Sequence, residues 1–192
     1  MSAGACLFLK PTPSLFILLH LNINFVEGDN VIRDILGYVL GLVIFIIGIP
    51  LVMFLASGSP NLSEITLIQW FLLIVLAIVG IGLSIWSIVY MKNVGGGNPF
   101  DAFNHEVAPR TTSLMTDGPY GICRNPMLLG VFIYHIGVLI AILSVGALLV
   151  FIIEVLIMNV QVKKEEQRLK NDFGKEYEEY VKNSNRFLPN IR

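Results

Sequence analysis

Gly118-Pro119-Tyr120-Gly121-Ile122-Cys123-Arg124-Asn125-Pro126-Met127 is a polar, turn-rich decapeptide placed directly before a long apolar region. A cation at the edge of such a region is costly unless it meets an anion, a backbone carbonyl or a lipid headgroup. Asn125 followed by Pro126 is a helix-start signal, with the asparagine as N-cap and the proline in the first turn. Arg124 and the free amides of a helix N-terminus are therefore predicted to converge at one point, which suits a carboxylate or a phosphate.

The composition predicts a membrane protein. Of the 192 residues, 55% are hydrophobic and only 14% are charged, whereas soluble domains contain about 25% charged residues. Two windows, 35–56 and 65–91, contain no charged residue, and each is long enough for a spanning helix of about 20 residues. We expect an integral, multi-pass membrane protein of the all-α class. The net charge of −1 gives no indication of nucleic acid, and no metal site is expected.

A third apolar region, residues 126–162, is too long for a single span. Its 37 residues include one charged side chain, that of Glu154, and as one helix they would extend about 55 Å at 1.5 Å per residue. That length is nearly twice the roughly 30 Å hydrocarbon core of a bilayer. The region must therefore fold back, and Ser144-Val145-Gly146 is the predicted bend between two short helices.

The basic residues predict the orientation. The loop at 57–64 has no Lys or Arg, the loop at 92–125 has three, and the tail at 163–192 has eight. The positive-inside rule places the second loop and the tail in the cytoplasm, and a hairpin provides the even number of crossings that this requires. Four spans are the simplest topology, with the last two forming the hairpin. A fifth depends on residues 1–34, which form either an interfacial segment or a short span.

Two acids, Glu165 and Glu166, follow the point where the last span leaves the bilayer. On a helix, Glu166 shares a face with Asn159. Glu165 shares one with Glu154 and Gln161. Because Lys and Arg residues surround the two acids, one interpretation is that they belong to a solvated charge cluster. Because the decapeptide lies at the same end of the hairpin, the functional alternative is that its arginine and both acids are neighbours that grip a zwitterionic ligand.

Three other polar side chains have roles that the sequence leaves open. Glu154 is an acid within the membrane, where ionisable groups are functional candidates by default, and the alternatives are a protonated acid or a bond to the backbone. His135 is either the partner of Glu154 or a packing residue. Cys123, next to Arg124, is either a spacer or a thiol of lowered pKa.

Beyond residue 162 the helical pattern becomes amphipathic. Apolar and aromatic side chains recur at three- and four-residue steps, namely Leu169, Phe173, Tyr177 and Tyr180. Gly174 can break or bend this helix, and Pro189 ends the pattern. We expect a C-terminal helix that packs its apolar stripe over the cytoplasmic face.

Several short motifs occur in a fixed order: Gly118-Pro119-Tyr120, Arg124-Asn125-Pro126-Met127, Gly130, Glu165-Glu166, Phe173-Gly174 and Tyr177. Together they resemble the isoprenylcysteine carboxyl methyltransferase family, integral-membrane enzymes that belong with the phospholipid methyltransferases. The resemblance covers residue 95 to the C-terminus. It implies S-adenosyl-L-methionine as methyl donor, bound at the cytoplasmic end of the hairpin. The chain would then divide into a segment 1–34, two transmembrane helices in 35–91 and a catalytic region 92–192.

The resemblance also implies roles for individual residues. Cofactor-binding positions are implied at Thr112, Ser113, Leu114, Met115, Tyr120, Arg124, Asn125, Pro126, Met127, Leu128, Glu165 and Glu166. Glu166 and Arg124 are the predicted catalytic pair. Asn125 and Leu128 depart from the histidine and tyrosine that are usual in the family. Gln161 stands where the prenylcysteine enzymes carry an arginine near the substrate carboxylate, and it is predicted, with Glu154, to face the substrate.

The resemblance implies transfer of a methyl group to a lipophilic substrate that enters from the surrounding membrane lipids. Carboxyl O-methylation of a prenylcysteine-like or other lipophilic substrate is the first hypothesis. Phospholipid amine N-methylation is the alternative, and since an amine must lose a proton, one of the acids would then act as a base. An NADPH-dependent membrane reductase and a non-enzymatic membrane protein are the hypotheses outside this class.

Overall fold

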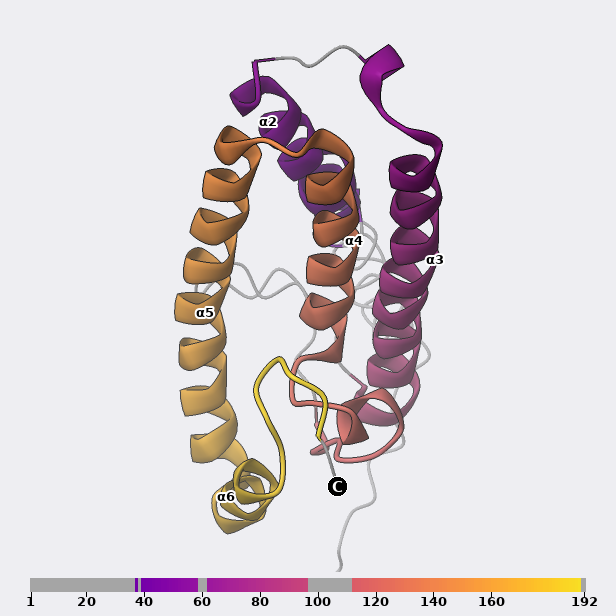
Figure 1. Ribbon diagram of the computed structural model, residues 1–192. Coiled ribbons are helices and arrows are strands. Elements are labelled where there is room, and N and C mark those ends of the chain that lie inside the picture. The colour runs from indigo at the N-terminus through magenta and orange to yellow at the C-terminus, as the bar shows by residue number, and fades with distance from the viewer. Residues whose placement is uncertain (1–36, 38, 59–61, 97–111, 191–192) are drawn as a thin grey trace, which may run out of the picture.

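The computed structural model describes residues 37, 39–58, 62–96 and 112–190, and every regular element in these ranges is helical (Figure 1). In order, the elements are η1 (Leu42–Gly48), α2 (Ile49–Ala56), η2 (Leu62–Glu64), α3 (Leu67–Tyr90), η3 (Met91–Gly95), η4 (Gly118–Gly121), α4 (Pro126–Ile142), α5 (Val145–Phe173) and α6 (Lys175–Lys182). The all-α prediction is confirmed. The expected N-terminal segment 1–34 and the middle of the loop 92–125 lie outside the described residues.

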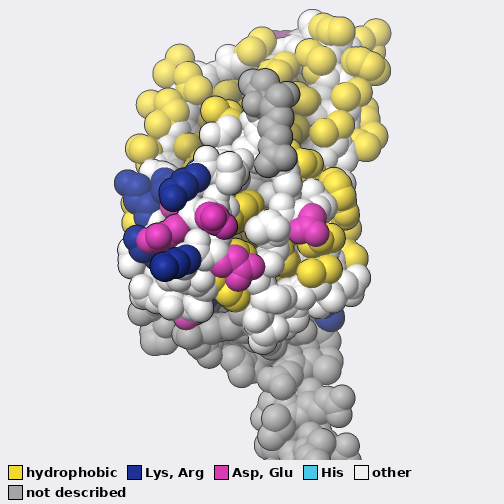
Figure 2. All heavy atoms as spheres, turned by 90° about the horizontal axis from the view of Figure 1, so that it is seen from below, with side chains coloured by type: hydrophobic (Ala, Val, Ile, Leu, Met, Phe, Trp, Pro, Cys, Tyr) yellow, Lys and Arg dark blue, Asp and Glu magenta, His cyan; other side chains and the backbone are white. Residues whose placement is uncertain are grey.

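Three helical stretches are long and apolar enough to cross a membrane, namely Val39–Ala56, Leu67–Gly95 and Val145–Phe173, and α4 is a shorter apolar helix. Hydrophobic side chains remain exposed along these stretches, such as Ile78 at 68% and Leu156 at 60%, and soluble proteins rarely expose apolar patches of that extent. Figure 2 looks at the end of the bundle that carries α6, named here the α6 end, where charged side chains gather beside hydrophobic flanks. The bundle has the surface of an integral membrane protein.

α3 and α4 lie side by side because small residues occupy their contact (Figure 1). A Cβ built on Gly80 of α3 would lie 2.3 Å from the carbonyl oxygen of Gly130 in α4, which leaves no room for a side chain. The Ser84 hydroxyl donates across the same contact to the carbonyl of Met127 at 2.9 Å. Small residues allow membrane helices to approach this closely. The contact fixes the first turn of α4 against α3.

Gly80→Ala is expected to destabilise the bundle, whereas Gly82→Ala, two positions along the same helix, is not. The methyl group added at Gly80 meets backbone atoms of α4, which cannot turn aside, and overpacking of this kind costs about 1–3 kcal/mol. A Cβ at Gly82 meets nothing within 4 Å, and alanine is favoured over glycine in a helix by about 1 kcal/mol. Thermal unfolding of both variants in one detergent measures the difference. Equal melting temperatures would contradict this account of the contact.

α4 and α5 form the predicted hairpin. α4 ends at Ile142, and Leu143 adopts the left-handed conformation with φ 47°. Ser144 then caps α5 by accepting a hydrogen bond from the amide of Gly146 at 3.2 Å, so the bend lies at residues 143–144 and overlaps the predicted one at Ser144. The second helix, α5, has 29 residues because it continues beyond residue 162, as the amphipathic pattern there predicts. Its polar half, residues 163–173, is rich in Lys and Glu, which favour the helix, and it carries the two acids on an extension of the span.

A polar pair is buried between α4 and α5. The Nδ1 atom of His135 lies 2.9 and 2.8 Å from the two carboxyl oxygens of Glu154, and Nε2 donates to the carbonyl of Phe45 at 2.8 Å. The adjacent Tyr134 hydroxyl donates to the carbonyl of Ile46 at 3.2 Å. Both carbonyls belong to η1, a π-helical stretch. The structure therefore pairs His135 with Glu154, and the pair joins three helical segments.

Candidate active site

A pocket lies at the α6 end, where the first turn of α4 and the polar half of α5 meet α6. The cavity at its centre has a volume of about 70 Å³, smaller than the about 300–1,000 Å³ typical of small-molecule sites. Of the residues predicted to bind a cofactor, 113–115, Tyr120, 124–128 and 165–166 line this pocket. The other lining residues are Met91, Val162, Leu169, Tyr177 and Tyr180.

The first turn of α4 forms one wall of the pocket, and its predicted start is confirmed. Asn125 occupies the N-cap position and Pro126 the first helical position. The asparagine side chain does not cap the helix, because its Nδ2 donates to the carbonyl of Arg186 at 3.2 Å. The amides of Met127 and Leu128 belong to the first turn and have no acceptor within the helix. This wall therefore presents backbone donors and the positive end of the helix dipole.

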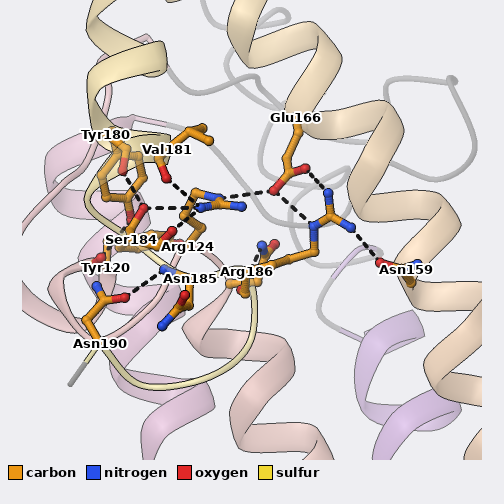
Figure 3. A network of polar contacts seen from close by, with 11 residues as sticks. Tyr120, Arg124, Asn159, Glu166, Tyr180, Val181, Ser184, Asn185, Arg186 and Asn190 are labelled. Carbon is orange, nitrogen blue, oxygen red and sulfur yellow. Dashed lines mark hydrogen bonds and ion pairs between the residues drawn. The ribbon is translucent and has the colours of Figure 1, made fainter.

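Arg124 lies between Glu166 and the chain that follows α6 (Figure 3). Its Nε donates to Oε1 of Glu166 at 3.1 Å, and the two side chains are 10% and 16% exposed. Its Nη1 donates to the carbonyl of Val181 at 3.3 Å and to both the carbonyl and the hydroxyl of Ser184. The predicted proximity of Arg124 to Glu166 is confirmed. These bonds direct the Nε and Nη1 donors to the protein itself.

Arg186, a residue that no motif singled out, is the second cation on Glu166 (Figure 3). Its Nε donates to Oε1 of Glu166 at 3.1 Å, its Nη2 donates to Oε2, and its Nη1 donates to Oδ1 of Asn159 at 2.6 Å. The hydrogen bond to Glu166 raises the pKa of Arg186 further above its ordinary value. Glu166 is therefore an ionised acceptor shared by two guanidinium groups. The sequence offered one hint of this contact, because Glu166 and Asn159 share a helix face. That face suits a cationic partner, but the sequence does not show which basic residue it is.

Residues 183–190, named here the C-terminal strap, run back along the decapeptide. Three backbone hydrogen bonds join the two segments, from the amide of Arg124 to the carbonyl of Asn185 (2.9 Å), from Asn125 to Arg186 (3.1 Å) and from Asn190 to Ile122 (2.7 Å). The Asn190 side chain adds a bond from its Nδ2 to the carbonyl of Gly121 at 3.2 Å. The strap thus holds the decapeptide in place by its backbone.

The strap also explains where the last helix ends. α6 stops at Lys182, well before Pro189, so the predicted end of the helical pattern is wrong. The strap must leave the helix to pair with the decapeptide, and Phe187 then packs against Phe132 of α4 with ring centroids 5.5 Å apart. Gly174 breaks the helix as predicted, since it has φ 54° between α5 and α6.

Other predicted site residues have different surroundings. The amide and hydroxyl of Thr112 both donate to the carbonyl of Gly95, at 2.7 and 3.3 Å, so Thr112 is held at the end of η3. Glu154 is paired with His135, and neither Glu154 nor Gln161 is among the described residues that line the pocket. The substrate roles of Gln161 and Glu154 remain predictions.

Burial is the main cause of the pKa shifts of the Tyr120 and Cys123 side chains in the decapeptide. It raises the pKa of the Tyr120 phenol and, in α6, that of Tyr180, whose hydroxyl donates to the Tyr120 carbonyl at 2.7 Å. Both phenols therefore stay protonated at neutral pH. Cys123 is fully buried, and burial raises the pKa of its thiol despite the neighbouring Arg124. This direction argues against a reactive thiolate and favours the spacer interpretation.

The chain is similar to one family of known proteins. A family model described as "Phospholipid methyltransferase" matches residues 68–176, which include most of α3, the decapeptide, α4 and all of α5. The C-terminal strap, with Arg186, lies outside the matched range. No curated protein and no solved structure matches the chain.

Proposed function

The chain belongs to the phospholipid methyltransferase family and is a membrane methyltransferase, and we propose that it uses S-adenosylmethionine at the pocket of the α6 end. The observation that carries this proposal is the convergence of Arg124, Glu166 and the first turn of α4 on one pocket. When bound, S-adenosylmethionine supplies an electrophilic methyl group. In line with the basic loop and tail, we place this end on the cytoplasmic side.

The lining of the pocket suits such a donor. Met91, Met115 and Tyr120 form an apolar cluster on its wall, which fits a purine ring. Glu165 also lines the pocket, and although burial and the neighbouring Glu166 raise its pKa to about 7, its carboxyl oxygens can accept a hydrogen bond from an ammonium group. The first-turn amides of α4 fit a carboxylate. Glu166, held by two guanidinium groups, positions these elements.

For the acceptor, we favour carboxyl O-methylation of a prenylcysteine-like lipid. A carboxylate is already ionised, so it requires a positioning cation and no base. Gln161 stands where the resemblance would place an arginine, so that cation is missing. Arg186 binds Asn159, two positions before Gln161, and supplies a guanidinium group there. An aromatic cluster of Phe132, Phe151 and Phe187 lies next to the pocket and suits an apolar chain.

Phospholipid amine N-methylation is the second candidate, and one observation favours it. Glu165 lines the pocket, and its ion pair with Arg168 is 4.0 Å long, longer than the 3.1 Å contact of Glu166 with Arg124. A carboxylate in that position is a candidate base for an amine that must lose its proton.

Isothermal titration of the purified protein with S-adenosylmethionine and with NADPH tests the proposal. We expect saturable binding of the first and none of the second. Binding of NADPH alone would support a reductase, and binding of neither would support a non-enzymatic role.

A methyl-labelled donor then identifies the acceptor. The protein is incubated with S-farnesylcysteine derivatives and, separately, with phosphatidylethanolamine vesicles, and labelled product is treated with base. A methyl ester releases labelled methanol under base, whereas an N-methyl group stays on the lipid. Base-stable label on phosphatidylethanolamine would overturn the preference for O-methylation.

A further inference from the structure

Tyr177, in α6, has a hydroxyl group whose hydrogen-bonding capacity is unused. The residue is only 3% exposed and lines the pocket. Its hydroxyl oxygen is buried and has no hydrogen-bond partner among the described residues. The large majority of buried polar side-chain atoms are hydrogen-bonded, and each exception requires an explanation.

Two other tyrosines of the described residues, Tyr180 and Tyr134, use their hydroxyl groups within the protein. The Tyr180 hydroxyl, one turn along α6, donates to the carbonyl of Tyr120 at 2.7 Å. The Tyr134 hydroxyl in α4 donates to the carbonyl of Ile46 at 3.2 Å. The ring of Tyr177 is packed edge-on against that of Tyr180, with centroids 6.3 Å apart. The ring is therefore fixed, and its hydroxyl is left for a group that enters the pocket.

The electrostatic surroundings place this hydroxyl at the charged part of the pocket. Burial is the main cause that raises the pKa of Tyr177, and Glu166 raises it further while Arg124 and Arg186 oppose the shift. The phenol is therefore a protonated donor at neutral pH, and it requires an acceptor.

Several guanidinium donors at this pocket are already used within the protein. Arg124 directs Nε and Nη1 to Glu166 and to the strap, and Arg186 directs its bonds to Glu166 and Asn159. The first-turn amides of α4 remain, as backbone donors on the opposite element. A carboxylate held by those amides gains a side-chain donor if Tyr177 faces it.

We propose that the Tyr177 hydroxyl donates a hydrogen bond to the carboxylate at the amino-acid end of the bound methyl donor. This inference rests on the proposed use of S-adenosylmethionine. It makes Tyr177 a binding residue of the donor pocket, and it makes α6 part of the pocket and not only a cover for it.

The test compares two ligands and two variants by isothermal titration. S-adenosylhomocysteine keeps the amino-acid end, whereas 5′-methylthioadenosine keeps the nucleoside and lacks that end. Tyr177→Phe is expected to weaken S-adenosylhomocysteine about tenfold, the size of one hydrogen bond to a charged group. It should leave 5′-methylthioadenosine binding within about twofold of wild type.

Thermal unfolding without ligand separates this role from a structural one. Tyr177→Phe removes a hydroxyl with no partner, so its melting temperature should equal or exceed that of wild type. Tyr180→Phe removes a formed bond, so its melting temperature should fall. A wild-type affinity of Tyr177→Phe for S-adenosylhomocysteine would overturn the inference, as would an equal loss for both ligands. Absence of binding to the wild-type protein would instead overturn the proposed function.

Discussion

Glu166→Gln is expected to lower both S-adenosylmethionine affinity and methyl transfer at least about a hundredfold. The glutamate accepts three hydrogen bonds from two guanidinium groups, and a bond to a charged partner contributes about 1.5–3 kcal/mol. The neutral amide removes the one negative charge that the two cations share, and its NH₂ group faces guanidinium donors. Arg124 and Arg186 would then separate, and the wall of the pocket that they hold would open. Titration calorimetry and a labelled-methyl assay measure both effects.

Glu178→Gln is the matched control for that variant. Glu178 also pairs with a base across two helices, since it lies 2.9 Å from Lys170, but both side chains are about half exposed. Exposed pairs contribute little because solvent screens them, so affinity and turnover should stay within about threefold of wild type. The Lys170 ammonium lowers the pKa of Glu178, so the pair is intact at neutral pH. Full activity of Glu166→Gln, or equal losses in both variants, would remove Glu166 from the site.

Arg124→Ala is expected to behave like Glu166→Gln while the protein still inserts into the membrane. The change removes the bond to Glu166 and the bonds that hold the strap. The spans of α3 and α5 do not depend on these contacts. We expect the variant to be extracted by detergent as a monodisperse protein. In titration calorimetry it should show no binding of the methyl donor.

The decapeptide and the hairpin could be predicted because each rests on a local constraint. Asn125-Pro126 is a start signal that acts within one turn, and the region 126–162 exceeds the bilayer whatever its partners are. The proximity of Arg124 to Glu166 followed from the hairpin alone, since both residues lie at the same end of it. These predictions required no knowledge of how the helices rotate about their axes.

The role of Arg186 could not be predicted for the opposite reason. It depends on the path of the strap, which backbone hydrogen bonds to the decapeptide determine. Eight basic residues follow position 162, and their spacing does not distinguish the one that reaches Asn159. The unused hydroxyl of Tyr177 was hidden in the same way, because the amphipathic pattern shows only that the ring is buried. The pairing of His135 with Glu154 required the rotation of two helices that the sequence does not define.

His135→Leu is expected to cost about 3–5 kcal/mol of folding free energy, because it leaves a buried carboxyl group without its partner. The Phe45 carbonyl can only accept, so Nε2 of His135 carries a hydrogen, and one further proton lies between Nδ1 and Glu154. The pair is therefore neutral as a unit and tolerable in an apolar bundle. Removing one member leaves Glu154 and the Phe45 carbonyl with unpaired polar atoms in surroundings that water does not reach.

The double variant His135→Leu/Glu154→Leu distinguishes a lost pair from lost packing. Replacing both members by apolar residues removes the unpaired carboxyl, so the double variant should be more stable than His135→Leu alone. Tyr134→Phe is the adjacent control, since it removes one bond to η1 and should cost about 1 kcal/mol. Denaturant unfolding in a single detergent ranks the three variants. If His135→Leu were no less stable than Tyr134→Phe, the pair would be incidental to the fold, and the junction of η1, α4 and α5 would rest on hydrophobic packing alone.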